Sequence, residues 1–303
     1  MYLIIPLSLL IFVIIFLRAK IPFIPFDNLN KIQSFNQQEV QLSLSLIVIP
    51  FIVYHSYGIL SLLYLSLFLI GYFDDKYSLS VKVRFLITTI LLFFLVIFSN
   101  QIIQFSFLSD LPIFFSLTIT LIFLLGFIHT INMIDGRNGF VLIVFINCLI
   151  LLNYKIFLSP SPSYDILILN IILCLMFVIN MLNISYLGNS GSILLTIFIG
   201  IIIINSYNQQ LISEKEIFCI FSIPFYDGLR VSLKRFLNQK NLFLPDNNHL
   251  HHIPKNWNYG IFVISFFLLI HNLLAINFQF HIAIFILITL IFYFLLFFTL
   301  KRF

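Results

Sequence analysis

The chain has 303 residues, of which 61% are hydrophobic and only 9% are charged. This composition excludes an ordinary soluble domain, because apolar runs of membrane-spanning length recur along the whole sequence. A lipid-exposed backbone must satisfy its own hydrogen bonds, and these continuous runs lack the alternating pattern of a β-barrel. The sequence therefore predicts an all-α fold, that of a polytopic integral membrane protein.

The apolar runs predict about eleven transmembrane helices. In chain order these are residues 1–17, 42–57, 59–72, 85–99, 112–130, 140–158, 166–184, 192–206, 216–232, 258–277 and 279–300. The first run lacks a basic start and a small-residue cleavage site, so we interpret it as an uncleaved span. No soluble domain or internal repeat interrupts the spans, and residues 1–303 are predicted to form a single transmembrane domain.

The basic residues predict the orientation of the spans. With the N-terminus outside, thirteen of the sixteen Lys and Arg residues fall in inner segments. Basic loops favour the cytoplasmic side of a membrane. An odd number of spans then places the C-terminus inside, on the side opposite the N-terminus. The inner loops are then near residues 18–41, 73–84, 131–139, 185–191 and 233–257. This bias explains the net charge of +5 without a nucleic-acid partner.

Four polar motifs lie at the inner ends of these runs. They are GYFDDKYSLS (71–80), NMIDGRNG (132–139), LGNSGS (187–192) and KRFLNQKNLFLPDNNHLHH (234–252), the longest polar run in the chain. Charge is costly in hydrocarbon, so such segments must lie in water or line a polar cavity. We expect the four motifs to meet on one face of the membrane and to form one polar site.

The first motif contains two adjacent carboxylates, Asp74 and Asp75. Their mutual repulsion would raise the pKa of one of them unless a cation compensates. Lys76, Lys82 and Arg84 are near in sequence, and a divalent metal would have the same effect. The alternative is a solvated helix end with mixed charges.

The second and third motifs combine polar side chains with glycines. Asn132 and Asp135 are three residues apart, so the end of a helix would place both on one face. The LGNSGS motif would offer free backbone amides at a helix N-terminus, which favours an anion. The alternatives are an ordinary helix-terminating turn for the second motif and a tight cap between two helices for the third.

The fourth motif ends in three histidines within four residues. The spacing is not that of a structural zinc site, and no Cys or Glu is close in sequence. Imidazole and guanidinium groups that donate hydrogen bonds to phosphate fit better, and a solvated basic loop is the alternative. Just before this motif, Asp227 and Arg230 are three residues apart, which predicts an ion pair within one helix.

In this order the motifs resemble the polyprenyl-phosphate N-acetylhexosamine-1-phosphate transferases. The resemblance implies a multi-pass enzyme of the bacterial cytoplasmic (inner) membrane, with its active site on the cytoplasmic face. Such enzymes transfer a sugar 1-phosphate from a UDP-N-acetylhexosamine to polyprenyl phosphate with Mg²⁺, or Mn²⁺ as an alternative, and release UMP. The HLHH form resembles the branch that starts surface polysaccharides, such as the O-antigen of lipopolysaccharide.

The resemblance also implies roles for individual residues. It implies catalytic roles for Asp74, Asp75, Asp135, His249, His251 and His252; substrate binding by Asn132, Asn138, Arg235 and Asp246; and metal ligation by Asp74, Asp135 and Asn189. The family usually has aspartate where this chain has Asn189, and residues 18–41 lack its Pro-, Arg- and Gly-Gly-rich signature.

Two other classes of protein are alternatives to an active transferase. The Asn189 change is compatible with a catalytically impaired relative that binds lipid phosphate or a partner enzyme. An ion-coupled transporter is the second, although its sites tend to lie near the bilayer midplane within inverted repeats. The sequence leaves open the sugar, the lipid length and the oligomeric state, for which a homodimer is one alternative.

Overall fold

The computed structural model describes residues 24–27, 40–104, 112–159, 164–239, 248–277 and 282–302. Within these ranges the chain forms ten α-helices, two short 3-10 helices and no strand beyond one isolated bridge between Phe26 and Gln41. The all-α prediction is therefore confirmed for the part of the chain that is described.

The helices follow one another with short connections. The α-helices are α2 (Ile49–His55), α3 (Ile59–Tyr77), α4 (Val81–Ser99), α5 (Ile113–Ile134), α6 (Phe140–Phe157), α7 (Asp165–Met181), α8 (Gly188–Asn208), α9 (Glu214–Leu237), α10 (Trp257–Asn277) and α11 (Ile282–Leu300). The 3-10 helices are η1 (Leu44–Ile47) and η3 (Leu250–His252).

The prediction of about eleven transmembrane helices is not supported. Six helices within the described ranges are long and apolar enough to cross a membrane: α4, α5, α6, α8, α10 and α11. The predicted span 42–57 is instead the turn η1 and the seven-residue helix α2, which rises only about 10 Å. The predicted span 1–17 lies outside the described residues. The protein is a multi-pass membrane protein.

The chain divides into two compact units. The described residues of the first unit are 24–27, 40–104, 112–128 and 171–200, and those of the second unit are 129–159, 164–170, 201–239, 248–277 and 282–302. Helices α5, α7 and α8 each contribute residues to both units. The prediction of a single domain stays a prediction.

In the first unit, α3 packs along α4, and α2 packs against α3. An extended segment pairs its backbone with the connection before α8: the amide of Leu44 donates to the carbonyl of Tyr186 at 3.1 Å, and the amide of Tyr186 donates to the carbonyl of Gln41 at 3.0 Å. Ser43 and Ser185 join the same two segments through their hydroxyl groups, which are 2.8 Å apart. These contacts fix the polypeptide that leads into α8.

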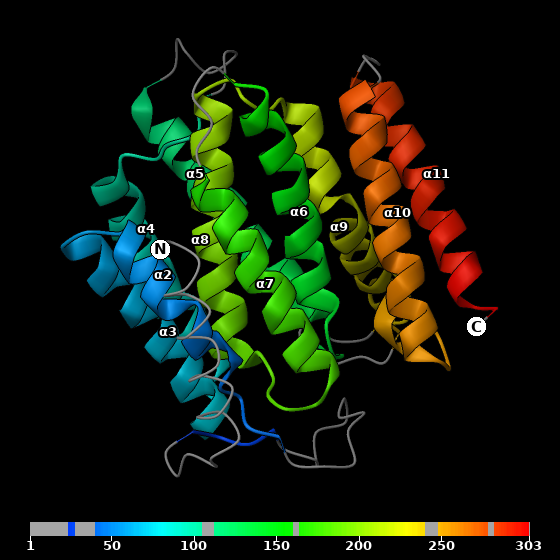
Figure 1. The fold of residues 1–303 in the computed structure, drawn as a ribbon, viewed down its shortest axis with the longest axis horizontal. Coiled ribbons are helices and arrows are strands. Elements are labelled where there is room, and N and C mark those ends of the chain that lie inside the picture. The colour runs from blue at the N-terminus through cyan, green and yellow to red at the C-terminus, as the bar shows by residue number, and fades with distance from the viewer. Residues whose placement is uncertain are drawn as a thin grey trace. The chain divides into compact units, whose positions relative to one another are not determined.

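In the second unit, α6 buries most of its side chains, including Phe140, Phe145 and Leu149. Helix α10 packs against α6, α9 and α11, and α9 also packs against α11 (Figure 1). Polar groups join the apolar helices at a few points; for example, the amide of the Asn272 side chain donates to the carbonyl of Asn147 at 2.8 Å. Helix α10 is therefore the element that joins α6, α9 and α11 in this unit.

Candidate active site

The first and third motifs come together in the first unit, through Asp75 at the end of α3. The carboxylate of Asp75 accepts hydrogen bonds from the backbone amides of Asn189, at 2.9 Å, and Ser190, at 3.1 Å. These amides open α8 and have no partner within their own helix. The LGNSGS amides therefore bind a carboxylate of the protein itself, and the binding of a substrate anion by this motif stays a prediction.

Asp74 has a different partner from its neighbour. Its carboxylate is buried and forms an ion pair with Arg84, near the start of α4. Of the three basic residues near the acidic pair in sequence, Arg84 is the one that binds Asp74. The two adjacent aspartates are held by different elements, one by a guanidinium group and the other by a helix N-terminus.

Two glycines allow this arrangement. A Cβ atom at Gly71 would overlap the backbone of Asn189 and Ser190, so α3 and the start of α8 can approach closely only without that side chain. Gly188 has φ +66, a left-handed conformation, and a Cβ there would also lie against the carboxylate of Asp75. The glycines in GYFDDKYSLS and LGNSGS thus serve the contact between these two motifs.

The second and fourth motifs come together in the second unit. The guanidinium group of Arg137 donates to the carbonyl oxygens of His251, at 2.9 Å, and Pro254, at 3.2 Å. The indole N–H of Trp257 donates to the carbonyl of Asn138 at 2.7 Å, and Arg137 lies over the Trp257 ring. These contacts join the NMIDGRNG turn to the histidine loop.

The NMIDGRNG turn also receives a histidine side chain. A Cβ atom at Gly136 would overlap the imidazole of His251, so the glycine leaves the space that this ring occupies. The backbone amide of Asp135 still donates to Ile131 at 3.0 Å, which continues the helical geometry of α5 through Asp135. The interpretation that Asn132 and Asp135 share the end of a helix is therefore confirmed.

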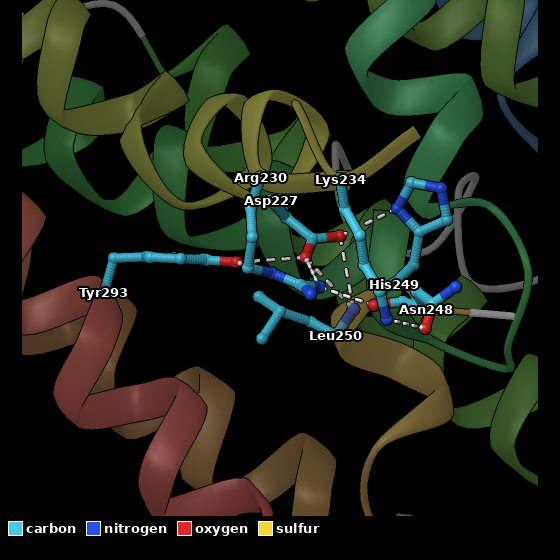
Figure 2. Close-up of polar contacts among 7 residues, drawn as sticks. All are labelled: Asp227, Arg230, Lys234, Asn248, His249, Leu250 and Tyr293. Carbon is cyan, nitrogen blue, oxygen red and sulfur yellow. Dashed lines mark hydrogen bonds and ion pairs between the residues drawn. The ribbon is translucent and has the colours of Figure 1, made fainter. Parts of the chain in front are cut away.

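A buried carboxylate anchors the histidine loop to α9. Asp227 is fully buried; Nδ1 of His249 lies 2.9 Å from its Oδ2, and Nη2 of Arg230 lies 2.7 Å from its Oδ1 (Figure 2). The hydroxyl of Tyr293, in α11, donates to the same carboxylate at 3.1 Å. The predicted pair of Asp227 and Arg230 is confirmed, but its role as the anchor of the loop, and the contribution of Tyr293, were not predicted.

The three histidines form a row. The rings of His249 and His251 are parallel, with centroids 5.7 Å apart, and those of His251 and His252 are 4.1 Å apart. Burial holds the pKa of His251 well below its ordinary value, and His252 and His249 lower it further. A neutral imidazole at position 251 can donate one hydrogen bond and accept another.

The remaining predicted site residues that the structure describes lie in or beside the NMIDGRNG turn and at the end of α9. Asn132 and Asn138 are half-buried in or beside the NMIDGRNG turn, and Arg235 is buried in the last turn of α9. Asp246 lies outside the described residues. The four motifs thus form two pairs, one in each unit, and the expectation that all four meet stays a prediction.

The three residues predicted to bind a metal ion carry oxygen donors. Carboxylate and amide oxygens are suitable ligands for Mg²⁺, and Asp74, Asp135 and Asn189 offer both kinds. Among the described residues, however, no three His, Cys, Asp or Glu side chains form a group that could hold a metal ion. In the first unit Asp74 is bound to Arg84. Magnesium binding by the three predicted residues stays a prediction.

The fold is that of a multi-pass helical membrane protein, and each unit carries a cluster of acidic and basic side chains. Residues 57–207 match the family model of glycosyl transferase family 4. The chain is 27% identical over 224 residues to an undecaprenyl-phosphate α-N-acetylglucosaminyl 1-phosphate transferase from Thermotoga maritima, an alignment of 72% of this chain and 69% of that protein.

A second relative supports the same assignment. The chain is 25% identical over 202 residues to a probable undecaprenyl-phosphate N-acetylglucosaminyl 1-phosphate transferase from Bacillus subtilis. That alignment covers 60% of this chain and 54% of the relative, so the chain spans about half the length of this second protein. These similarities support glycosyl transferase family 4, in agreement with the order of the motifs.

Proposed function

We propose that this protein transfers an N-acetylhexosamine 1-phosphate from a UDP-sugar to polyprenyl phosphate and releases UMP. The observation that carries the proposal is the pairing of motifs: Asp75 binds the start of α8, and the NMIDGRNG turn contacts the histidine loop. Both relatives are named for undecaprenyl phosphate and for an N-acetylglucosaminyl 1-phosphate group. The reaction would start a cell-envelope polysaccharide, such as the O-antigen of lipopolysaccharide.

The proposed reaction joins two phosphate groups. An oxygen of the lipid phosphate attacks the phosphorus that carries the sugar, the bond from this phosphorus to the bridging oxygen breaks, and UMP leaves with the bonding electrons. Catalysis of such a step is mostly positioning and stabilisation of negative charge. In the second unit, Arg235, His251 and His252 are the proposed donors to the nucleotide phosphates, and Asn132, Asp135 and Asn138 are the proposed contacts of the nucleotide. We also propose that Asp246 contacts the sugar nucleotide.

We also propose magnesium as the cofactor, held by the residues that the family resemblance implies: Asp74, Asp135 and Asn189. When bound, a hard cation neutralises phosphate oxygens that would otherwise repel one another. In the first unit, the ion pair with Arg84 holds Asp74 in a defined orientation. Asp75 is proposed to act near the lipid phosphate while it holds the start of α8.

We propose that the histidine loop faces the cytoplasm of a bacterial cell. The exposed Asn238, after α9, and the exposed Gln209, after α8, test this in a cysteine-free background. A cysteine at position 238 should react with an impermeant thiol reagent only after the cells are opened. A cysteine at position 209 should react in intact cells. The reverse pattern would contradict the orientation.

The decisive experiment is an assay of the purified protein in detergent with undecaprenyl phosphate, magnesium and UDP-N-acetylglucosamine or UDP-N-acetylgalactosamine. Release of UMP and formation of a lipid-linked sugar are expected together. His252→Ala should lower the rate about 100-fold or more, because it removes a donor to the developing charge. His55→Ala, which changes a histidine packed against Phe51, should leave the rate unchanged.

A protein that binds undecaprenyl phosphate but transfers no sugar would contradict the proposed activity. Such a result would favour a catalytically impaired relative, for which Asn189 is the specific observation. Formation of a dimer, which the sequence leaves open, is measured in the same preparation by its mass in detergent.

A further inference from the structure

We propose that Asp227 and Tyr293 are positioning residues that hold the imidazole of His249 in one orientation and one tautomer during transfer. The inference rests on the proposed function. It also assigns a role to α11, which lies outside residues 57–207, the segment that matches the family.

Several groups of the protein converge on the carboxylate of Asp227. Asp227 has no exposed surface, and four residues donate to it: His249, Arg230, Tyr293 and, through its backbone amide at 3.2 Å, Leu250 (Figure 2). A buried carboxylate is tolerated only when such donors replace water. The arrangement fixes both the side chain of His249 and the main chain that follows it.

The carboxylate of Asp227 determines which nitrogen of His249 carries the hydrogen. An ionised carboxylate can only accept hydrogen bonds, and Arg230 stabilises the ionised form of Asp227. The imidazole nitrogen that faces it, Nδ1, therefore carries the hydrogen. Nε2, on the other side of the ring, then offers its lone pair when the ring is neutral. A carboxylate behind a histidine sets the tautomer in this way in many enzymes and metal sites.

His249 is connected to the rest of the histidine row by its contact with the ring of His251. The rings of His249 and His251 lie within 3° of parallel. Rotation of the first ring would therefore disturb the stacked pair. Through this contact, the carboxylate on α9 orients more than one of the imidazoles that are proposed to face phosphate.

Position 293 requires a tyrosine because its hydroxyl contacts both Arg230 and Asp227. Its hydroxyl accepts a hydrogen bond from Nε of Arg230 at 2.7 Å and donates one to Oδ1 of Asp227. The side chain is 1% exposed, so no water can replace this hydroxyl without rearrangement. Phenylalanine would fill the same space in α11, but it would leave a half-buried guanidinium group and a buried carboxylate each short of one partner.

The chain contains a matched control for this tyrosine. Tyr226 also joins α9 to α11: its hydroxyl donates to the carbonyl of Ile286 at 3.0 Å and lies 3.0 Å from the hydroxyl of Thr289. Tyr226 makes no hydrogen bond to Asp227 among the contacts described. Tyr226→Phe and Tyr293→Phe therefore each remove one hydroxyl between the same two helices, but only the second changes the surroundings of the carboxylate.

The test compares kcat and KM for the UDP-sugar in the two variants. Tyr293→Phe should lower kcat about 10- to 100-fold, the usual effect of losing a group that orients an active-site histidine, with little change in KM. Tyr226→Phe should remain within about twofold of the unchanged protein, because the ring that packs against Tyr293 is retained and the lost hydroxyl bonds only Ile286 and Thr289 among the contacts described. In a His249→Ala background, Asp227→Asn should lower kcat by a clearly smaller factor than in the unchanged protein, because the part of its effect that acts through His249 is already lost. A purely structural role would instead lower kcat by the same factor in both backgrounds.

A second measurement does not depend on turnover. Hydrogen exchange of the peptide that contains Leu250 should be faster in Tyr293→Phe than in the unchanged protein, and it should be unchanged in Tyr226→Phe. If the unchanged protein transfers no sugar, the proposed function fails, and the exchange rates still decide whether the loop is positioned. If the two Tyr→Phe variants behave alike in both measurements, the positioning role is overturned.

Discussion

The Oδ1 atom of Asp75 lies 2.9 Å from the backbone nitrogen of Asn189, and this contact joins the end of α3 to the start of α8. A carboxylate at a helix N-terminus satisfies amides that lack intrahelical partners and interacts favourably with the helix dipole. Asp74, one residue earlier, is bound to Arg84 instead. Two neighbouring aspartates that look equivalent in the sequence therefore have separate structural roles.

The first prediction concerns the stability that Asp75 supplies. Asp75→Ala should lower the free energy of unfolding by about 1–2 kcal/mol, the usual cost of losing a helix cap. Asp75→Asn should cost less, because its amide oxygen can still accept one hydrogen bond. The measurement is thermal unfolding in detergent. Asn189→Ala is the matched control, since it changes the side chain but retains the amide that binds Asp75. Equal melting temperatures for Asp75→Ala and the control would contradict the prediction.

Most of the helix positions could be predicted from the sequence, because a long continuous apolar run has few alternatives in a membrane. The predicted span 140–158 and the helix α6 differ by one residue at one end. The prediction failed at 42–57, where hydrophobicity cannot distinguish a span from an apolar segment that pairs its backbone with a distant loop. Leu44 bonds to Tyr186, and nothing in the local sequence indicates that contact.

The candidate site could be predicted only in part for the same reason. The pair of Asp227 and Arg230 is local, and its spacing was sufficient to predict it. The sequence could not show that Tyr293 completes the pair, because this residue is 66 positions from Asp227 and lies within an apolar helix. A hydroxyl or amide in an otherwise apolar span was the available signal, since a buried polar group requires a partner.

The second prediction uses the close approach of Gly136 to His251. Gly136→Ala should lower the rate of sugar transfer by about 10-fold or more, because the added methyl group displaces an imidazole that is proposed to face phosphate. Gly126→Ala is the control, since a Cβ at that position in α5 meets no atom within 4 Å. Gly126→Ala should stabilise the protein by about 0.5–1 kcal/mol, because glycine is less favourable than alanine in a helix interior. Similar activity in both variants would show that the ring is not held against the turn.

The third prediction follows from the low pKa of His251. Burial, together with the nearby His252, His249 and Arg137, holds this pKa well below 6.5, although Asp227 opposes the shift. In the unfolded chain the imidazole takes up a proton near pH 6.5, whereas in the folded protein it remains neutral. Stability from this residue is therefore complete above pH 6.5 and is lost as the pH falls below it, by up to about 1.4 kcal/mol per pH unit.

Thermal unfolding between pH 5 and pH 8 measures this dependence. His251→Gln removes the titrating group, so the melting temperature of the variant should fall less steeply below pH 6.5 than that of the unchanged protein. The comparison of slopes is independent of the general cost of the substitution, which is present at every pH. Equal slopes would show that His251 is protonated in the folded protein as readily as in the unfolded chain.

The last prediction concerns Asn189, which is half-buried at the start of α8. Magnesium prefers charged oxygen ligands and loses its water reluctantly, so a neutral amide should bind it more weakly than a carboxylate in the same place. Asn189→Asp should lower the magnesium concentration that gives half-maximal UMP release, with little change in melting temperature. Asn183→Asp, an exposed asparagine just before the same loop, is the control for added charge and should leave the midpoint unchanged. An unchanged midpoint in Asn189→Asp would show that position 189 does not contact the metal.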